Sequence, residues 1–265
     1  MSDKPILFSG PMVRAIFDDR KTETRRVLNP QPFERVSGFQ KVGTDTKTGL
    51  AIFESRDVFG KPSHAFKQGK HFVTPYAPVK YAVSDRLYVR ENFAVEDGSS
   101  CGCSEAPCGC PQKGEVMYKA TQDSSEIKWK PSIHMPKAFS RIWLEVVGVK
   151  VERLQDINWQ DAIAEGVESA RGFSPSGMVY RDYQCSSFLM ENALHSPIDS
   201  FKSLWNSLNA KPKPRYGKDE SGKKIITHFE SYPWGKSDYG STYRGKLHII
   251  YSNPWIVAYS YEREK

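Results

Sequence analysis

Long polar stretches separate the apolar segments of this chain, and this pattern limits the folds that it can adopt. The longest apolar segment is Ile142–Val151, and shorter ones are Lys4–Phe8, Leu87–Val89 and Trp255–Tyr261. β-Branched and aromatic residues dominate them, which is typical of strands. The strands do not alternate with helices as they do in βαβ folds. We therefore expect an α+β fold around a small β-barrel or open barrel.

Three helices are expected beside these strands. The first follows Ser9, has Pro11 in its first turn, and carries apolar residues at helical spacing up to Phe17. We expect it to end near Asp19-Arg20, before a strand over residues 22–27. A second helix begins after Asn158 as N-cap and stops at Gly166, and a third spans Ile198–Leu208.

Glycine, lysine, serine and threonine are frequent in the remaining segments, which we interpret as insertions into a single domain over residues 1–265. The insertions lie at about 33–78, 92–133, 168–197 and 211–245. Residues 211–245 contain few aliphatic side chains and are poor candidates for the core. The 12% aromatic content of the chain still requires a packed core elsewhere.

The charge balance of the chain favours an anionic partner. The sequence carries 38 Lys and Arg against 31 Asp and Glu, a net charge of +7. A nucleic acid or nucleotide suits this excess, and a basic solvated surface is the alternative interpretation. The sequence has no run of eighteen apolar residues and no signal-peptide pattern at its start, so we expect a cytoplasmic protein with no membrane partner. Nothing in it predicts the oligomeric state.

Arg20–Arg26 holds the densest group of polar side chains. A lysine enclosed by other cations and desolvated has its pKa lowered toward that of a general base. Lys21 would then take a proton from Thr24, whose hydroxyl is a weak nucleophile until a base activates it. On a continuous strand the two side chains would face opposite ways, so the pairing requires Lys21 to lie in the turn before the strand. Alternatively, Lys21, Arg25 and Arg26 form a solvated or phosphate-contacting patch.

These residues resemble a known family. Residues 10–16 followed by Arg20–Arg26 resemble the Arg-Lys-Thr-x-Thr-x-Arg signature of ASCH domains, which are PUA-like β-barrels. Ser84–Val89 is similar to the Gly-Asp-x-Leu-x-Val strand of that family, and Leu154–Glu165 is similar to the helix that follows its long central strand. The resemblance implies a PUA-like (ASCH) mixed β-barrel with flanking helices and large loop insertions.

The resemblance also implies an activity. Small bacterial ASCH proteins include amidohydrolases that remove the acetyl group from N4-acetylcytidine, using a lysine, a threonine and a glutamate. By motif, these roles fall on Lys21, Thr24 and Glu165. Lys21 would deprotonate Thr24 for attack on the amide carbonyl, and Glu165 would orient Lys21 or transfer the proton to the leaving amine. No cofactor is needed for this chemistry.

The substrate implied is a modified nucleoside, RNA or another single-stranded nucleic acid. We expect it to contact Arg20, Arg25, Arg26, His134 and Arg141. The chain is more than twice as long as the small amidohydrolases, and its His134–Arg141 and C-terminal segments are similar to larger members encoded by phages and prophages. Other ASCH proteins are thought to bind or cleave RNA. A non-catalytic module that binds RNA or modified DNA and a ribonuclease therefore remain as alternatives.

Four cysteines lie within ten residues, at Cys101, Cys103, Cys108 and Cys110. Two Cys-x-Cys pairs across a turn are able to supply the four soft ligands of a tetrahedral zinc, which would then be structural because no coordination position stays open. Reduced free thiols and disulfides are the alternatives, and nothing indicates an oxidising compartment. Cys185 stands alone and is interpreted as a passive thiol.

Aromatic residues near the C-terminus suit stacking on single-stranded bases. They alternate with the cations Lys236 and Arg244, and they are Tyr232, Trp234, Tyr239 and Tyr243. A polar loop held in place by aromatic side chains is an equally good interpretation.

Overall fold

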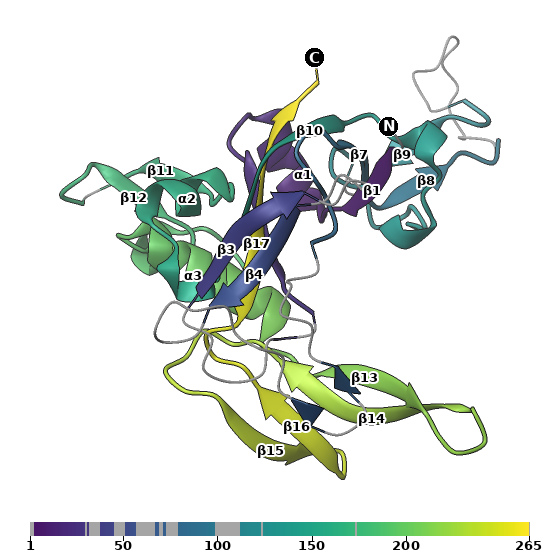
Figure 1. Ribbon diagram of the computed structural model, residues 1–265. Helices are drawn as coiled ribbons and strands as arrows, with labels where there is room; N and C mark the ends of the chain where they lie inside the picture. Colours follow the sequence, from purple (N-terminus) through teal and green to yellow (C-terminus); the bar gives the residue numbers. More distant parts are fainter. Residues whose placement is uncertain are drawn as a thin grey trace, which may run out of the picture.

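The computed structural model describes residues 3–29, 31, 38–44, 51–56, 67–68, 71–72, 79–98, 112–122, 124–172 and 174–264. Within them the chain forms an α+β protein in which strands outnumber helices, which confirms the predicted class (Figure 1). None of the helices in these ranges is long and apolar enough to cross a membrane.

A five-stranded sheet, which we call the central sheet, occupies the middle of the molecule. Its order is β1-β7-β10-β17-β2, with β1 and β7 parallel and the other neighbours antiparallel. The strands are β1 (Lys4–Leu7), β7 (Arg86–Arg90), β10 (Trp143–Arg153), β17 (Trp255–Arg263) and β2 (Glu23–Val27). Four of them lie where the apolar pattern predicts strands, and β2 lies within the strand expected over residues 22–27.

Strand β17 separates two hydrophobic cores. Trp255, Val257 and Tyr259 pack with residues of β1, β7 and β10, whereas Ile256 and Ala258 pack on the opposite face. Successive side chains of a strand point to opposite faces, so a strand with a core on each side needs apolar residues at every position. The unbroken apolar run of this segment follows from that requirement.

The central sheet does not close into a barrel. Strands β1 and β2 are its two edges, and no ladder of backbone hydrogen bonds joins them in the described part of the chain. The Arg26 guanidinium on β2 instead donates a hydrogen bond of 2.8 Å to the Leu7 carbonyl at the end of β1. The two edges therefore lie close together, and we call the opening between them the β1–β2 seam.

The first two helices flank this seam. Helix α1 (Gly10–Phe17) joins β1 to β2, begins after Ser9 and carries Pro11 in its first turn, as predicted. It ends two or three residues earlier than expected, at Phe17. Helix α2 (Trp159–Ala164) begins after Asn158, whose side chain accepts a hydrogen bond from a backbone N–H in the first turn. Both helices end close to the start of β2, because Thr22 N donates to Ala164 O at 2.8 Å.

Helix α3 (Pro197–Asn209) packs its apolar face in the second core, with Phe201 and Trp205 buried. The predicted helix over Ile198–Leu208 is confirmed. Short 3-10 helices occur at Ser132–His134, Lys137–Phe139, Leu154–Asp156 and Met190–Asn192.

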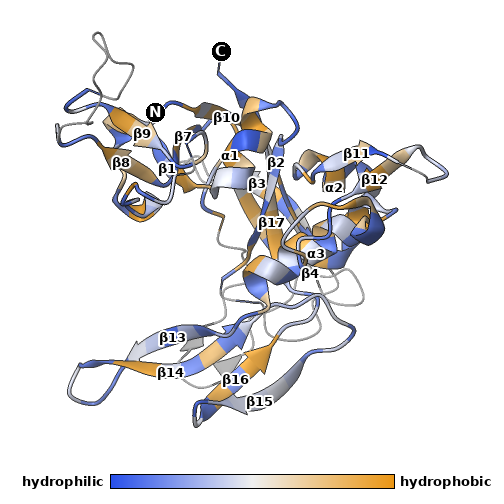
Figure 2. Ribbon diagram, turned by 180° about the vertical axis from the view of Figure 1, so that it is seen from behind, coloured by the Kyte–Doolittle hydropathy of each residue, from blue (hydrophilic) through white to orange (hydrophobic). Residues whose placement is uncertain are grey.

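A second, four-stranded sheet extends from one end of the molecule (Figure 1). Its order is β13-β14-β16-β15, and the strands are β13 (Lys213–Lys218), β14 (Lys224–Ser231), β16 (Lys246–Ile250) and β15 (Tyr239–Tyr243). The segment 211–245 is therefore regular structure rather than an irregular insertion. Polar residues occupy most of β13 and β15, and most apolar residues of the second sheet lie in β14 and β16 (Figure 2). An apolar pattern does not detect strands of this kind.

Two-stranded hairpins fill parts of the other predicted insertions. They pair β3 (Gly38–Thr44) with β4 (Ala51–Arg56), β5 (Lys67–Gln68) with β6 (His71–Phe72), β8 (Phe93–Val95) with β9 (Val116–Tyr118), and β11 (Ser169–Arg171) with β12 (Met178–Tyr180). The hairpin of β11 and β12 replaces part of the loop expected over 168–197. Cys101, Cys103, Cys108 and Cys110 lie outside the described residues, so the zinc site stays a prediction. Cys185 is a free, partly buried thiol.

Candidate functional site

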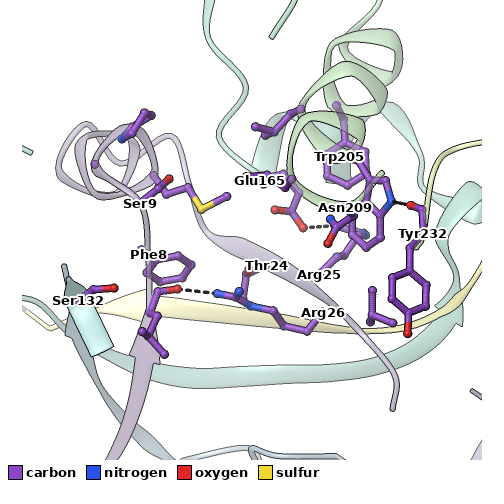
Figure 3. Close-up of a pocket in the computed structure, with 18 of the residues that line it drawn as sticks. Phe8, Ser9, Thr24, Arg25, Arg26, Ser132, Glu165, Trp205, Asn209 and Tyr232 are labelled. Carbon is purple, nitrogen blue, oxygen red and sulfur yellow. Dashed lines mark hydrogen bonds and ion pairs between the residues drawn. The ribbon is translucent and has the colours of Figure 1, made fainter. Parts of the chain in front are cut away.

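A cleft of about 800 Å³ lies at the β1–β2 seam. Residues 7–12 form one wall, at the end of β1 and the start of α1, and Thr24–Val27 of β2 form the floor (Figure 3). Glu165 enters from the end of α2, and helix α3 and strand β13 supply the wall that faces α1. The cleft therefore lies where the incomplete closure of the central sheet exposes side chains of both edge strands.

Lys21 lies directly beneath this region and has no solvent-exposed side-chain surface. Its Nζ donates three hydrogen bonds, to the Glu23 carbonyl (2.8 Å), the Glu165 carbonyl (2.8 Å) and Glu165 Oε2 (2.7 Å). An ammonium group has three donors, so all of them are used. Burial lowers the pKa of Lys21 below its ordinary value, and the carboxylate of Glu165 opposes that shift.

The backbone around Lys21 and Glu165 requires a glycine. The two residues form an isolated antiparallel bridge, and Gly166 follows with φ of +83°. A Cβ at Gly166 would lie 2.7 Å from the Cβ of Lys21. Both the left-handed backbone and this close approach favour glycine. Gly166, expected only as a helix stop, thus lets the end of α2 dock on Lys21.

Glu165 lies between two cations. Its Oε2 accepts from Lys21, and its Oε1 lies 3.4 Å from Arg25 Nη1. The side chain is nearly buried, with 5% of its surface exposed, yet it lines the cleft. Glu165, to which the resemblance assigns the role of the glutamate, is thus the carboxylate that contacts Lys21.

Arg25 is surrounded by carboxylates. Its terminal nitrogens form ion pairs with Glu23, Glu152, Asp161 and Glu165 at 2.8–3.4 Å. Burial lowers the pKa of Arg25, but the four carboxylates outweigh burial and raise it. Because these partners occupy the guanidinium, Arg25 supports the floor of the cleft, and the structure does not present it as the substrate contact that the sequence predicted.

Thr24 is 2% exposed and lies on β2 opposite Tyr259, with its side chain at the cleft floor (Figure 3). The geometric condition for a Lys21–Thr24 pair is met, because Lys21 precedes β2 and lies in the connection from α1. The hydrogen bond itself is not formed, since the three donors of Lys21 are directed at Glu23 and Glu165.

The other predicted contact residues divide into one inside the cleft and three outside it. Arg26 is exposed, lines the cleft, and its guanidinium lies 5.4 Å from the centre of the Phe8 ring. Arg20 pairs with Asp18 and the Gly166 carbonyl, and His134 is exposed on a 3-10 helix; neither lines the cleft. Arg141 also lies outside the cleft lining. It is held by Glu91 at 2.9 Å and packs on the Tyr118 ring. Arg20, His134 and Arg141 lie near recognisable motifs in the sequence, but position in the sequence alone does not show whether a side chain faces the cleft.

Several lining residues were not singled out by the sequence. Phe8 comes from the end of β1, Trp205 from α3, and Lys213 and Arg215 from β13. Tyr232, identified from its aromatic segment, also lines the cleft, and its carbonyl accepts a 2.6 Å hydrogen bond from Trp205 Nε1 (Figure 3). No local motif marks these positions, because the fold brings them together from distant segments.

A scan against protein-family models and searches of curated proteins and of solved structures found no match to this chain. Function is therefore argued from the chemistry of the cleft.

Proposed function

We propose that the protein is an amidohydrolase that removes an acyl group from a modified cytosine base, such as the acetyl group of N4-acetylcytidine. One observation carries the proposal: Lys21 and Glu165, 144 residues apart, form a buried ion pair of 2.7 Å, and Glu165 lines the same cleft as Thr24. A buried charged pair is costly to maintain, so such pairs concentrate at functional sites.

The arrangement supports a lysine–threonine mechanism. A proton passes from Lys21 to Glu165 Oε2 and leaves a neutral amine, which the lowered pKa of Lys21 favours. The amine turns from the Glu23 carbonyl and takes the proton of Thr24 Oγ1 as that oxygen attacks the acyl carbon. The C–N4 bond then breaks, N4 takes a proton from Lys21, and an acyl ester remains on Thr24. Water attacks the ester as Lys21 takes its proton and passes it to Thr24 Oγ1, and the carboxylic acid leaves. Glu165 then returns its proton to Lys21, which restores the ion pair.

Two groups of hydrogen-bond donors line the cleft and would stabilise the oxyanion of the proposed reaction. Arg26 lines the cleft from β2, two residues beyond Thr24. The first turn of α1 lines it from the facing wall, and N–H groups at a helix N-terminus stabilise negative charge. The strand–helix–strand order of β1, α1 and β2, with a sheet that curls without closing, also fits the PUA-like ASCH fold that the motif implies.

A second candidate is a module that binds RNA or modified DNA without catalysis. Two observations favour it: all three donors of Lys21 are occupied away from Thr24, and cations of β2 and β13 line the cleft. Such a module would lose affinity steeply with added salt, whereas hydrolysis of an uncharged nucleoside would depend on salt only weakly.

The test is release of acetate and cytidine from N4-acetylcytidine. Thr24→Val keeps the volume of the side chain and removes the nucleophile, while Thr24→Ser retains a hydroxyl as the matched control. We expect Thr24→Val and Lys21→Met to lower kcat/KM by about 10² to 10⁴-fold and Thr24→Ser to keep measurable turnover. Circular dichroism checks folding of each variant.

Either of two results would contradict the proposal. Full activity of Thr24→Val removes the threonine as nucleophile. Absence of turnover by the wild type removes this substrate and favours the binding module.

A further inference from the structure

Cations from four separate segments of the chain converge on the cleft. They come from α1, from β2, from the segment after β9 and from β13, and they are Arg14, Arg26, Lys119, Lys213 and Arg215. Among the described lining residues the sole carboxylate is Glu165, which already lies between Lys21 and Arg25. Positively charged residues therefore outnumber carboxylates among the residues that line the cleft.

Arg26 and Lys213 both donate to uncharged oxygens. Arg26 donates to the Leu7 carbonyl, and Lys213 donates to Asn209 Oδ1 at 2.9 Å. Neither forms an ion pair with a carboxylate in the described ranges. Burial lowers the pKa of Lys213, and the charges of Arg215 and Arg26 lower it further. The positive charges of Arg26, Lys213 and Arg215 repel one another, and an anion that binds between them offsets this repulsion.

Contacts with Glu230 and Tyr232 hold the side chain of Arg215 in place. Its Nε donates to Glu230, and its Nη2 lies 2.6 Å from the Tyr232 hydroxyl. These contacts restrict the guanidinium before any ligand arrives, which lowers the entropy lost on binding. A planar guanidinium and an ammonium group at one site suit a phosphate, because both donate charge-assisted hydrogen bonds to its oxygens.

We propose that Arg26, Lys213 and Arg215 bind a phosphate group of the substrate, so that the cleft takes a nucleotide rather than an uncharged nucleoside. The inference rests on the proposed function, in which the base lies at Thr24. The phosphate has two sources, a free mononucleotide or the backbone of a single strand. Lys213 and Arg215 both belong to β13, so the second sheet contributes substrate affinity to a site whose proposed nucleophile, Thr24, belongs to β2 of the central sheet.

The test measures binding, which does not require turnover. Calorimetry compares cytidine, cytidine 5′-monophosphate and a five-residue oligocytidylate at low salt, with the wild type and with Lys213→Gln. The matched control is Lys218→Gln, which removes one charge from an exposed position on the same strand, β13. Circular dichroism confirms folding.

We expect the monophosphate to bind the wild type at least about tenfold more tightly than cytidine. Lys213→Gln should reduce that ratio to about threefold or less, and Lys218→Gln should leave it unchanged. Tighter binding of the oligonucleotide with a steeper salt dependence identifies the backbone as the source, and equal binding of the two phosphate ligands identifies a mononucleotide.

Equal affinity for cytidine and its monophosphate, or no binding of either, would overturn the phosphate site. So would an equal loss of the ratio in both lysine variants. The proposed reaction fails separately: if N4-acetylcytidine is not hydrolysed but the preference for the monophosphate depends on Lys213, the phosphate site stands and the amidohydrolase does not.

Discussion

The two sheets of this protein are stabilised in different ways. Strand β17 of the central sheet is buried on both faces from Trp255 to Tyr259, whereas β13 and β15 of the second sheet have no fully buried residue. The second sheet buries a few side chains, among them Phe229, His248 and Ile250. Burial of apolar surface is therefore the main source of stability in the central sheet, and the second sheet depends more on hydrogen bonds and polar pairs.

The comparison extends to the charged groups. Arg25 on β2 of the central sheet and Lys21, two residues before β2, are fully or almost fully buried with their carboxylates. In the second sheet, Arg215 and Glu230 keep 28% and 13% of their side-chain surface exposed. A charge without its partner is far more costly when buried, so the same change should have unequal effects in the two sheets.

The largest difference is expected from removing one carboxylate that pairs with an arginine of each sheet, Glu165 with Arg25 of β2 and Glu230 with Arg215 of β13. Glu165→Gln leaves Lys21 and Arg25 short of a buried negative charge and should lower the free energy of unfolding by about 3–5 kcal/mol. Glu230→Gln, beside the partly exposed Arg215, should cost about 1–2 kcal/mol. Urea denaturation at pH 7 measures both. Equal losses would show that the two charge clusters are equally desolvated.

The next difference comes from the same apolar truncation in each sheet. Leu144 on β10 has no exposed surface, and Leu144→Ala should cost about 2–5 kcal/mol through lost burial and the cavity it leaves. Leu247 on β16 is 56% exposed, and Leu247→Ala should stay within about 0.5 kcal/mol of the wild type. The urea midpoint measures each change. A loss above about 2 kcal/mol for Leu247→Ala would mean that a further layer covers the second sheet.

The smallest difference concerns pH. Burial raises the pKa of Tyr81 from 10.0 to about 12, so between these values the unfolded chain ionises while the folded one holds the proton. Stability should fall by up to about 2–3 kcal/mol over this range because of Tyr81. Tyr81→Phe should reduce that loss. Tyr216→Phe, an exposed control on β13, should not change it. Thermal unfolding between pH 9 and 11.5 measures the slopes, and identical slopes in both variants would remove Tyr81 as the cause.

The starts of the helices that flank the site were predictable, because they depend on residues that are close together in the sequence. Ser9, Pro11 and Asn158 mark helix starts that the structure confirms, and the resemblance placed Lys21 and Glu165 in one cluster. The role of Arg25 was not predictable, because its four carboxylates come from segments up to 140 residues away. The same holds for Arg141, whose partner Glu91 fixes it outside the cleft.

Local composition was enough to locate the most buried strands of the central sheet, because a strand buried on both faces needs a continuous apolar run, as in Trp255–Tyr261. Three features depend on how distant segments pack: the sheet stays open between β1 and β2, α2 places Glu165 on Lys21, and β13 adds Lys213 to the opposite wall. The apolar composition of a short segment indicates whether it will be buried. The pairing of edge strands and of distant charges depends instead on how segments far apart in the chain pack together.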